Sequence, residues 1–478
     1  MKKYNIERNI KFAVLSDEAI EQINKASLTI MEQLGMKISG ERTLKLLHEN
    51  GCYTDENGIT RISRDLVRKA LETVPKEVII YDRNKNPHMI LNSKNNLYFG
   101  THADQLEILD IETDSVRPFL KKDTELMCKI AQNLKNIDFV LSVGLSSDVD
   151  PKVQSVISFI ETLKYFEKPI NFSTNDIDTI QEIIDIAALV AGGKEVLQEK
   201  PFIFNYCEPI PPLTHPAEST EKLYLSAINK IPVVYMPYCM MGGTAPMNMA
   251  TTLAQCYSEI LTGIVVTQLI NPGAPFIIGA MPSIFDMKTS IGSYAAPEFH
   301  LMIAAASEMA DYYNLPFYGT AACSDSKSLD AQAFAEVSMQ VFSTFLSKAN
   351  VVHDVGIMDH CNSVSPVMVV IADEIIEAAK HYARGIKVDD ATLNLDLISR
   401  VGHGGHYLNE KETFKKFKQV WYPSLFSRRM KNPDQSEVHS IAKEWINKIM
   451  ENHPGSTLDA AILEKLDEIQ QKYMDSVK

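Results

Sequence analysis

The stretch Pro232-Val-Val-Tyr-Met-Pro-Tyr-Cys-Met-Met241, followed by Gly242-Gly-Thr-Ala-Pro246, decides the fold. Its first part is apolar and contains β-branched residues, which indicates a buried strand. A long helical pattern begins near Met247. A glycine loop between a strand and a helix is a building unit of α/β enzymes, which usually place their chemistry at such loops.

Seven further apolar runs share this rhythm, and helical stretches separate them. Five of the eight runs begin with proline, which suits the first residue of a strand. Eight strands alternating with helices predict a (β/α)8 TIM barrel, and a doubly wound open sheet is the alternative that the spacing leaves open. The eight runs are 97–101, 138–144, 169–174, 201–206, 232–238, 275–280, 316–321 and 350–356.

Regions of a different character flank these runs. Before them, Ser16 and Ser63 are placed to cap two helices, and residues 78–82 and 87–91 indicate two strands around a turn. After them, the chain carries several amphipathic helices and both tryptophans. We therefore divide the chain into an N-terminal α+β extension (1–96), the barrel (97–385) and a C-terminal helical segment packed on the barrel (386–478).

The bulk composition favours a soluble protein. Asp and Glu outnumber Lys and Arg by 61 to 47, a net charge of −14, which argues against binding nucleic acid through a basic surface. The start of the chain lacks the apolar core of a signal peptide, and no apolar run reaches the roughly 18 residues of a membrane helix. The seven cysteines are scattered without a CxxC pair, which predicts reduced thiols and a cytoplasmic location.

Candidate site residues follow from the barrel prediction, because the carboxyl ends of the strands and the loops after them form the site. Tyrosine faces and a carboxylate at these positions would suit a positively charged onium ion, and Phe285 would suit the same pocket. The candidates for substrate binding are Tyr98, His102, Tyr206, Glu208 and His353.

A zinc site is the alternative. Cys207, Cys239, Cys323 and His353 all fall at strand ends, where zinc enzymes gather ligands. No close-spaced ligand pair supports this interpretation, and the glycines of His403-Gly-Gly-His406 favour a tight turn over a metal pair. We predict that this chain binds no metal and keep a zinc-dependent barrel enzyme as the alternative.

Six segments along the chain form a recognisable series: Leu46-Leu-His-Glu-Asn-Gly-Cys52, Ile62-Ser-Arg-Asp-Leu-Val67, Gly242-Gly-Thr-Ala-Pro246, Ser324-Asp-Ser-Lys-x-x-Asp-Ala-Gln332, Gly404-Gly-His-Tyr-Leu408 and Trp421-Tyr-Pro423. In this order they resemble the trimethylamine methyltransferase family in its branch without pyrrolysine, and the resemblance covers nearly the whole chain. One local departure is Lys411-Glu-Thr413, where the family pattern has a His-Thr pair.

The resemblance implies a barrel that moves a methyl group from a methylated amine to the Co(I) of a separate corrinoid protein. The family archetype carries pyrrolysine in the barrel mouth and uses trimethylamine. Members of the other branch resemble methyltransferases for quaternary amines: glycine betaine, proline betaine, carnitine or γ-butyrobetaine. The resemblance further implies that this chain binds no cofactor itself, that a partner protein carries the corrinoid (cobalamin) and docks transiently, and that the reaction serves one-carbon metabolism of the methanogenic or acetogenic type. A homo-oligomer is compatible with the sequence.

The chemistry of a quaternary amine fits this difference in substrate between the two branches of the family. Such an amine already carries its charge and leaves as a neutral tertiary amine, so Co(I) can attack the methyl carbon directly. The protein then supplies position and a suitable field and needs no general acid, so we assign no catalytic residue. We expect Tyr98 and Tyr206 to line the onium, with Glu208 nearby; each aromatic contact is worth about 0.5–2 kcal/mol.

The substrate carboxylate needs hydrogen-bond donors, and we expect His353 to be the first choice and His102 the second. Gly242 and Gly243 either let the backbone approach the substrate or the corrin, or form a helix-entry turn. A betaine-binding sensor without turnover is the remaining alternative.

Overall fold

The computed structural model describes residues 12–93, 96–101, 104–174, 176–428, 438–453 and 455–477. At its centre is a parallel eight-stranded sheet whose strands follow one another in sequence order. A bridge between Gly100 and Phe139 joins the first strand to the second and closes the circle. This confirms the (β/α)8 barrel, with a strand in each of the eight apolar runs. The strands are β6 (Tyr98–Thr101), β9 (Val140–Leu141), β10 (Ile170–Phe172), β11 (Ile203–Cys207), β13 (Val233–Tyr235), β15 (Phe276–Gly279), β18 (Phe317–Thr320) and β19 (Val351–Val355).

Aromatic rings fill the interior of the barrel. The ring of Phe139 lies 5.4 Å from that of Phe204 and 6.0 Å from that of Tyr318. Gly100 makes room for this layer, because a Cβ atom at that position would lie 2.3 Å from the ring of Phe139. The barrel is therefore a packed core with its site confined to one end.

Helices surround the barrel. Asp176 caps α6 and Gly192 ends it in the left-handed conformation. One described helix, α9, is long and apolar enough to cross a membrane, but 89% of its most apolar window is buried within the fold, as in the core helix of a soluble protein. The helices are α4 (Lys121–Asn133), α5 (Gln154–Tyr165), α6 (Ile177–Ala191), α7 (Lys194–Glu199), α8 (Ala217–Ile228), α9 (Met249–Ile270), α10 (Pro297–Tyr312), α11 (Ala331–Leu346) and α12 (Pro366–Ala383).

The N-terminal extension packs on α9 through its helices. Ser16 and Ser63 cap α1 and α3 as predicted. The sequence missed three short strands, of which β1 pairs in parallel with β12 (Thr214–His215) from the barrel, so a barrel loop completes the sheet of the extension. The elements are α1 (Asp17–Thr29), η1 (Ile30–Leu34), α2 (Glu41–Glu49), α3 (Arg64–Thr73), β1 (Met36–Ile38), β2 (Tyr53–Thr54), β3 (Ile59–Arg61), β4 (Val78–Tyr81) and β5 (Pro87–Leu91).

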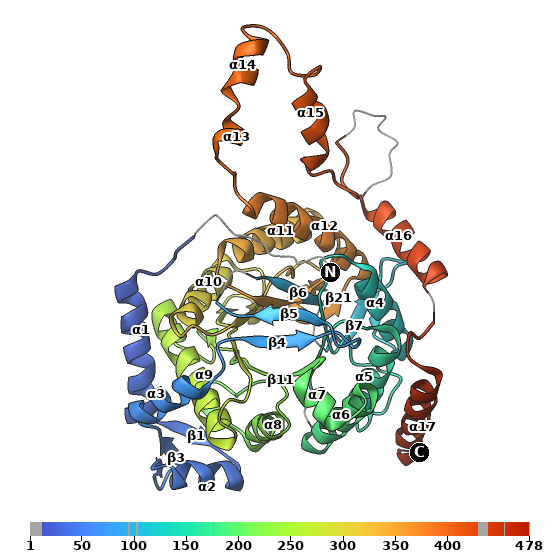
Figure 1. The fold of residues 1–478 in the computed structure, drawn as a ribbon. Coiled ribbons are helices and arrows are strands. Elements are labelled where there is room, and N and C mark those ends of the chain that lie inside the picture. The colour runs from blue at the N-terminus through green and yellow to red at the C-terminus, as the bar shows by residue number, and fades with distance from the viewer. Residues whose placement is uncertain are drawn as a thin grey trace.

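The hairpin β4–β5 crosses the amino end of the barrel (Figure 1). Its backbone is tied to the residues just before two barrel strands. The Tyr81 N–H donates to the carbonyl of Pro201, and the Arg83 N–H donates to that of Glu167, each at 2.8 Å. The hairpin closes this end and leaves the carboxyl end for the site.

Short strands in the loops after the barrel strands build two small sheets at the carboxyl end. These sheets link loops that follow different barrel strands, so the rim of the mouth is held as a unit. Their elements are β7 (Glu107–Leu109), β8 (Val116–Pro118), β20 (Ile357–Met358), η2 (Asp359–Cys361) and β21 (Ser363–Val364) in one region, and β14 (Met240–Met241), β16 (Ser283–Asp286) and β17 (Ile291–Ser293) in the other.

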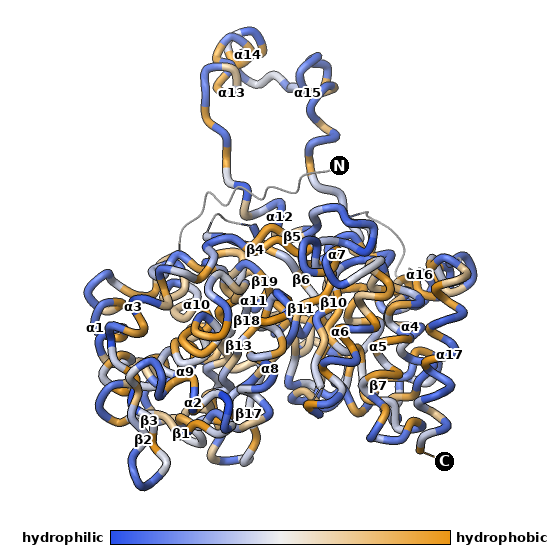
Figure 2. Tube along the Cα trace, turned by 60° about the horizontal axis from the view of Figure 1, so that its bottom comes forward, coloured by the Kyte–Doolittle hydropathy of each residue, from blue (hydrophilic) through white to orange (hydrophobic). Residues whose placement is uncertain are grey.

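The C-terminal segment divides into a packed part and a projecting part. α16 (Val438–Asn452) packs on α12 and α4, and α17 (Ala460–Ser476) packs on α5 and α6. Residues 386–422, which we call the arm, stand away from the barrel (Figures 1 and 2) and contain no buried residue. The prediction that the whole segment packs on the barrel is therefore wrong for the arm. The arm contains α13 (Asp390–Leu393), α14 (Leu395–Val401), α15 (Lys411–Lys416) and η3 (Phe417–Gln419).

Candidate active site

Strand β11 supplies the centre of the site through the alternation of its side chains. Phe204 and Tyr206 face the other interior rings, since both lie within ring-contact distance of Tyr318. Asn205 and Cys207 face outward and bond to α8. This period of two is inherent in a strand, and it directs Tyr206 into the barrel.

A tyrosine, a carboxylate and an imidazole meet at this end. The Tyr206 hydroxyl donates to Glu208 Oε1 at 2.5 Å, and the Tyr206 ring lies 5.7 Å from that of His353. The ring of Tyr318 lies 6.2 Å from that of Tyr206 and 4.9 Å from that of His353, and its hydroxyl donates to Asn171 Oδ1 at 2.9 Å. The structure thus brings together three of the five predicted substrate-binding residues.

An irregularity in β19 adds a second carboxylate. The pairing of β19 with β6 shifts register between Val352 and Val355, and Asp354 there has a φ of +78°. This bulge lets Asp354 accept a hydrogen bond from the Thr320 hydroxyl and approach His353 Nε2 at 3.4 Å. His353 Nδ1 lies 2.9 Å from the Gly319 carbonyl, so both imidazole nitrogens already have partners.

Three carboxyl groups at the mouth have raised pKa values. Desolvation is the main cause for Glu208, Asp354 and Asp104, and it raises the pKa of Asp104 to about 7. Solvent still reaches Glu208, whose side chain is exposed. Glu208 is therefore accessible to a ligand, although the crowding of the mouth leaves its carboxyl group poorly hydrated.

Lys222 is a cation whose charge acts on two of these carboxyl groups, Asp104 and Glu208. It is buried, with 7% of its surface exposed, on the turn of α8 that follows Ser219, whose hydroxyl donates to the Glu208 carbonyl. The charge of Lys222 lowers the pKa of Asp104 and of Glu208. Among the described residues, none forms an ion pair or hydrogen bond with its ammonium group in the structure. A buried ammonium with open donors is poised for an anionic ligand.

Sequence reasoning missed Lys222, Tyr318 and Asp354 as members of this cluster. Tyr318 lies within a predicted strand, two residues before the end of β18, so inward alternation could have found it. Lys222 lies in the middle of a helix and gives no local signal. Asp354 depends on a bulge, which adjacent residues in the sequence do not reveal.

Tyr98 does not belong to this cluster, which corrects the prediction. Tyr98 is the first residue of β6, and its hydroxyl accepts a hydrogen bond from the Ile90 N–H of β5 at 3.1 Å. It therefore lies at the amino end of the barrel. The strand predicted from this apolar run is present, but Tyr98 is its first residue and so does not reach the carboxyl end. His102 lies outside the described residues.

The glycine loop forms a tight turn after β14. The Gly242 N–H donates to the Ala245 carbonyl at 2.8 Å, and Gly242 has a φ of +88°. A Cβ at Gly242 would lie 2.8 Å from Met247 Cε, whereas a Cβ at Gly243 would meet only ordinary contacts, such as Phe285 Cβ at 3.6 Å. Gly242 is therefore required by the turn itself, and Gly243 is not.

The segment 324–332 braces the rim. Asp330 caps α11 by accepting from the Ala333 N–H at 3.0 Å. Asp325 accepts from the Tyr294 N–H at 2.8 Å and lies 3.1 Å from His360 Nδ1, which joins the loops after β15, β18 and β19. This segment holds neighbouring loops in place.

The zinc interpretation finds no support among the described residues, which contain no group of three or more His, Cys, Asp or Glu side chains able to hold a metal. Cys207 Sγ contacts the Ser219 carbonyl, and Cys323 Sγ contacts Gln340 Oε1 at 3.2 Å. Burial raises the pKa of the Cys207 thiol to about 12, which disfavours the thiolate that zinc requires.

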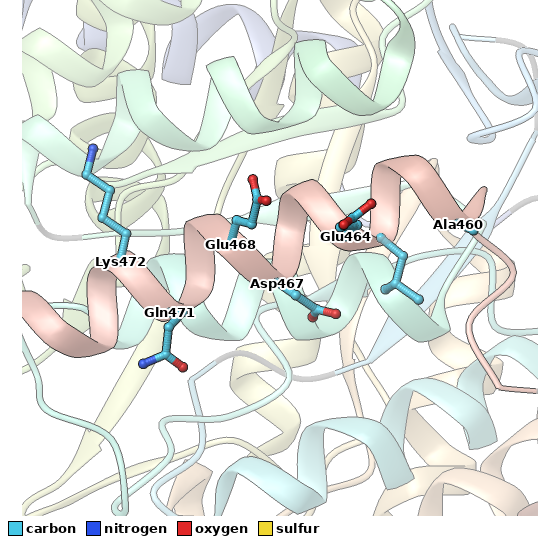
Figure 3. Close-up of a pocket in the computed structure, with 7 residues that line it drawn as sticks. Ala460, Glu464, Asp467, Glu468, Gln471 and Lys472 are labelled. Carbon is cyan, nitrogen blue, oxygen red and sulfur yellow. The ribbon is translucent and has the colours of Figure 1, made fainter.

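A depression on the outer face of α17 is unrelated to this cluster (Figure 3). It is lined mainly by charged and amide side chains of one helix, including Glu464, Asp467 and Lys472. Because α17 packs on α5 and α6 with its other face, this is a solvated helix surface.

The sequence also matches known proteins along its whole length. The family described as trimethylamine methyltransferase (MTTB) matches residues 1–477. Glycine betaine methyltransferase of Desulfitobacterium hafniense (strain Y51) is 28% identical over 471 residues, which cover 95% of this chain and 96% of that protein. Trimethylamine methyltransferase MttB of Methanosarcina barkeri (strain Fusaro / DSM 804) is 27% identical over 490 residues, covering 98% and 97%.

A solved structure shares the fold. The crystal structure of the Methanosarcina barkeri monomethylamine methyltransferase (MtmB) matches with a TM-score of 0.50 and 11% identity, covering 93% of this chain and 96% of that one. Its hydroxylamine complex matches with a TM-score of 0.51. At such identities the likeness concerns the fold alone, and the sequence match carries the family. The chain is a methyltransferase and belongs to the trimethylamine methyltransferase family.

Proposed function

We propose that this enzyme transfers a methyl group from a zwitterionic quaternary amine to the Co(I) of a partner corrinoid protein. The observation that carries the proposal is the cluster at the carboxyl ends of β11 and β19, where an aromatic ring, Tyr206, and a carboxylate, Glu208, adjoin a buried cation, Lys222. Similarity to a glycine betaine methyltransferase supports the same substrate class.

The pocket suits both ends of such a substrate. The Tyr206 face and the Glu208 carboxylate attract the quaternary nitrogen, and the hydrogen bond from Tyr206 spreads the charge of Glu208. The ammonium of Lys222 binds the substrate carboxylate. We assign this role to Lys222 in place of His353, because both nitrogens of His353 are occupied by Gly319 and Asp354.

The transfer needs no proton. The electron pair of Co(I) forms the bond to the methyl carbon, and the carbon–nitrogen bond breaks with its electrons remaining on nitrogen, so a neutral tertiary amine leaves. The side chains at the mouth therefore position the methyl group toward the opening and exclude water from its other faces. The corrinoid protein docks at this end and departs after transfer.

The first experiment incubates the enzyme with Co(I) corrinoid and follows methyl-Co(III) by absorbance. Glycine betaine, proline betaine, carnitine and γ-butyrobetaine are compared with trimethylamine. We expect methylation by one or more of the betaines and none by trimethylamine. Methylation by trimethylamine alone would refute the proposed substrate class, and tight betaine binding without any methyl transfer would identify a sensor.

A second experiment tests the role of Lys222. Lys222→Met is compared with the wild type for binding of glycine betaine and of tetramethylammonium, which lacks a carboxylate. At a pH well above 7, where Asp104 stays charged, we expect the variant to weaken betaine binding by about tenfold or more and not to weaken tetramethylammonium binding. Equal loss for both ligands would show that Lys222 supports the fold of the pocket and does not bind the carboxylate.

A further inference from the structure

A buried carboxylate interrupts the apolar sequence of α9. Glu259 is the single charged residue of this helix, and 0% of its surface is exposed. Burying a carboxylate is costly unless hydrogen bonds replace the water that it loses. Glu259 Oε1 accepts from the Leu213 N–H at 2.8 Å and from the side-chain amide of Gln255 at 3.1 Å. Each of these partners leads to a loop at the mouth of the barrel.

The first partner belongs to the loop that carries Glu208. Residues 208–215 follow β11, and Leu213 is the point at which other parts of the molecule hold this loop. Its N–H donates to Glu259, and its carbonyl accepts from the Lys37 N–H of β1 at 2.9 Å. Leu213 has a φ of +54°, which a leucine adopts only where its surroundings fix it. The loop is therefore positioned from outside the barrel, by α9 and by the N-terminal extension.

The second partner leads to the glycine turn. Gln255 is 7% exposed and lies one helical turn before Glu259, on the same face of α9. Its Nε2 donates to Glu259 Oε1 and also, at 3.0 Å, to the carbonyl of Thr244 in the turn 242–246. An amide nitrogen carries two donor hydrogens, and here both have an oxygen acceptor. The two side chains thus form a bridge from the Leu213 N–H to the Thr244 carbonyl.

This bridge joins two adjacent loops of the mouth, because β11 and β13, which precede them, are paired neighbours in the barrel. A binding site must be held within about 0.5 Å of its productive geometry by the residues behind it. We propose that Glu259 and Gln255 are positioning residues, which hold the loop of Glu208 against the glycine turn and so set the site for the cation. The inference rests on the proposed role of Glu208 in binding that cation.

The test uses substitutions to methionine, which has a similar length and lacks the hydrogen-bonding atoms. Glu259→Met and Gln255→Met each break the bridge, so each should raise KM about tenfold for the amine that the wild type demethylates and leave kcat nearly unchanged. The double variant should be little worse than either single one, because the bridge needs both side chains. Glu259→Gln keeps an oxygen acceptor and should retain most of the wild-type affinity.

The matched control is Gln268→Met, near the other end of α9. Gln268 is 3% exposed and also joins the helix to backbone, since it accepts from the Gly273 N–H and donates to the Ala274 carbonyl, each at 2.9 Å. Its replacement should lower the melting temperature about as much as Gln255→Met does and should leave KM unchanged. An equal rise in KM for Gln268→Met would show that these residues act through stability alone and would overturn the proposal.

Hydrogen–deuterium exchange measures the bridge without turnover. Glu259→Met should speed exchange at Leu213, and Gln255→Met should speed it in the turn 242–246, whereas Gln268→Met should affect Gly273 instead. Unchanged exchange at both loops would overturn the proposal, as would an unchanged KM in folded Glu259→Met and Gln255→Met. A wild type that demethylates no quaternary amine would refute the proposed function, and the exchange rates would still decide whether the bridge holds the two loops.

Discussion

Two lysines at opposite ends of the barrel show how differently this fold uses a charge. At the amino end, the ammonium of Lys168 donates to the carbonyls of Ala131, Leu134 and Ile137 at 3.0, 2.8 and 2.6 Å. At the carboxyl end, Lys222 is buried beside carboxyl groups, and among the described residues none bonds to its ammonium. The first lysine is saturated by the protein and the second retains its capacity to bind.

The same contrast holds for Tyr98 and Tyr206, which we predicted from the sequence to line the same pocket. Tyr98 is not part of the mouth, because its hydroxyl accepts a hydrogen bond from the hairpin that closes the amino end. Tyr206 presents its ring beside His353 and its hydroxyl to a solvent-exposed carboxylate. Satisfied polar groups mark the end that stabilises the barrel, and incompletely satisfied ones mark the end that binds.

The largest effect is expected at Lys168. Lys168→Met removes three hydrogen bonds and leaves three carbonyls without their donor, so the free energy of unfolding should fall by about 3 kcal/mol. Denaturant unfolding measures this loss. KM and kcat of the folded variant should equal those of the wild type, and a large change in KM would show that the amino end also shapes the pocket.

A smaller effect, confined to activity, is expected at Glu208. Glu208→Gln keeps the shape of the side chain and removes its charge, so kcat/KM for a quaternary amine should fall about 30-fold, which corresponds to about 2 kcal/mol. The loss should appear mainly in KM, because the cation is bound before transfer and becomes neutral during it.

Tyr98→Phe is the matched control at the other end of the barrel. It removes one hydrogen bond to Ile90 and should reduce stability by about 1 kcal/mol without affecting KM. If Tyr98→Phe raised KM as much as Glu208→Gln, the proposed separation between the two ends would be wrong.

The glycine turn provides the next comparison. Gly242→Ala places a Cβ at a φ of +88° and 2.8 Å from Met247, which should cost about 1–2 kcal/mol of stability. Gly243→Ala meets only ordinary contacts and should be nearly neutral by thermal unfolding. A loss of methyl transfer in stable Gly243→Ala would show that the backbone there approaches the substrate or the corrin, which the turn alone does not require.

Most of the barrel could be predicted from the sequence, because apolar runs, proline starts and helix caps are local signals. The eight runs each contain a strand, and Ser16 and Ser63 cap the helices expected of them. The arm was placed wrongly for a physical reason. Amphipathic spacing predicts a helix with an apolar face, but it does not say which surface covers that face.

The candidate site was less accessible to sequence reasoning. Tyr206, Glu208 and His353 were found because they end strands or lie near those ends, and Tyr98 was misplaced because the same rule was applied at a strand's first residue. Lys222 reaches the mouth from a helix, and Asp354 reaches it through a bulge. Both depend on tertiary packing, for which a single sequence carries no local pattern.

The smallest effect concerns pH. The pKa of Asp104 is raised to about 7 because burial disfavours its charged form. Below that pH the carboxyl group is neutral, and above it the group carries a negative charge that attracts a cation at the mouth. The affinity for tetramethylammonium, which does not titrate, should therefore rise roughly fivefold as pH increases through about 7, the size of a screened interaction of about 1 kcal/mol. Titration calorimetry across this range measures the change in affinity.

The control is Asp104→Asn. This variant should bind tetramethylammonium at every pH with the affinity that the wild type shows at low pH. If its affinity still rose with pH, the titrating group would be Glu208, whose pKa is also raised by desolvation.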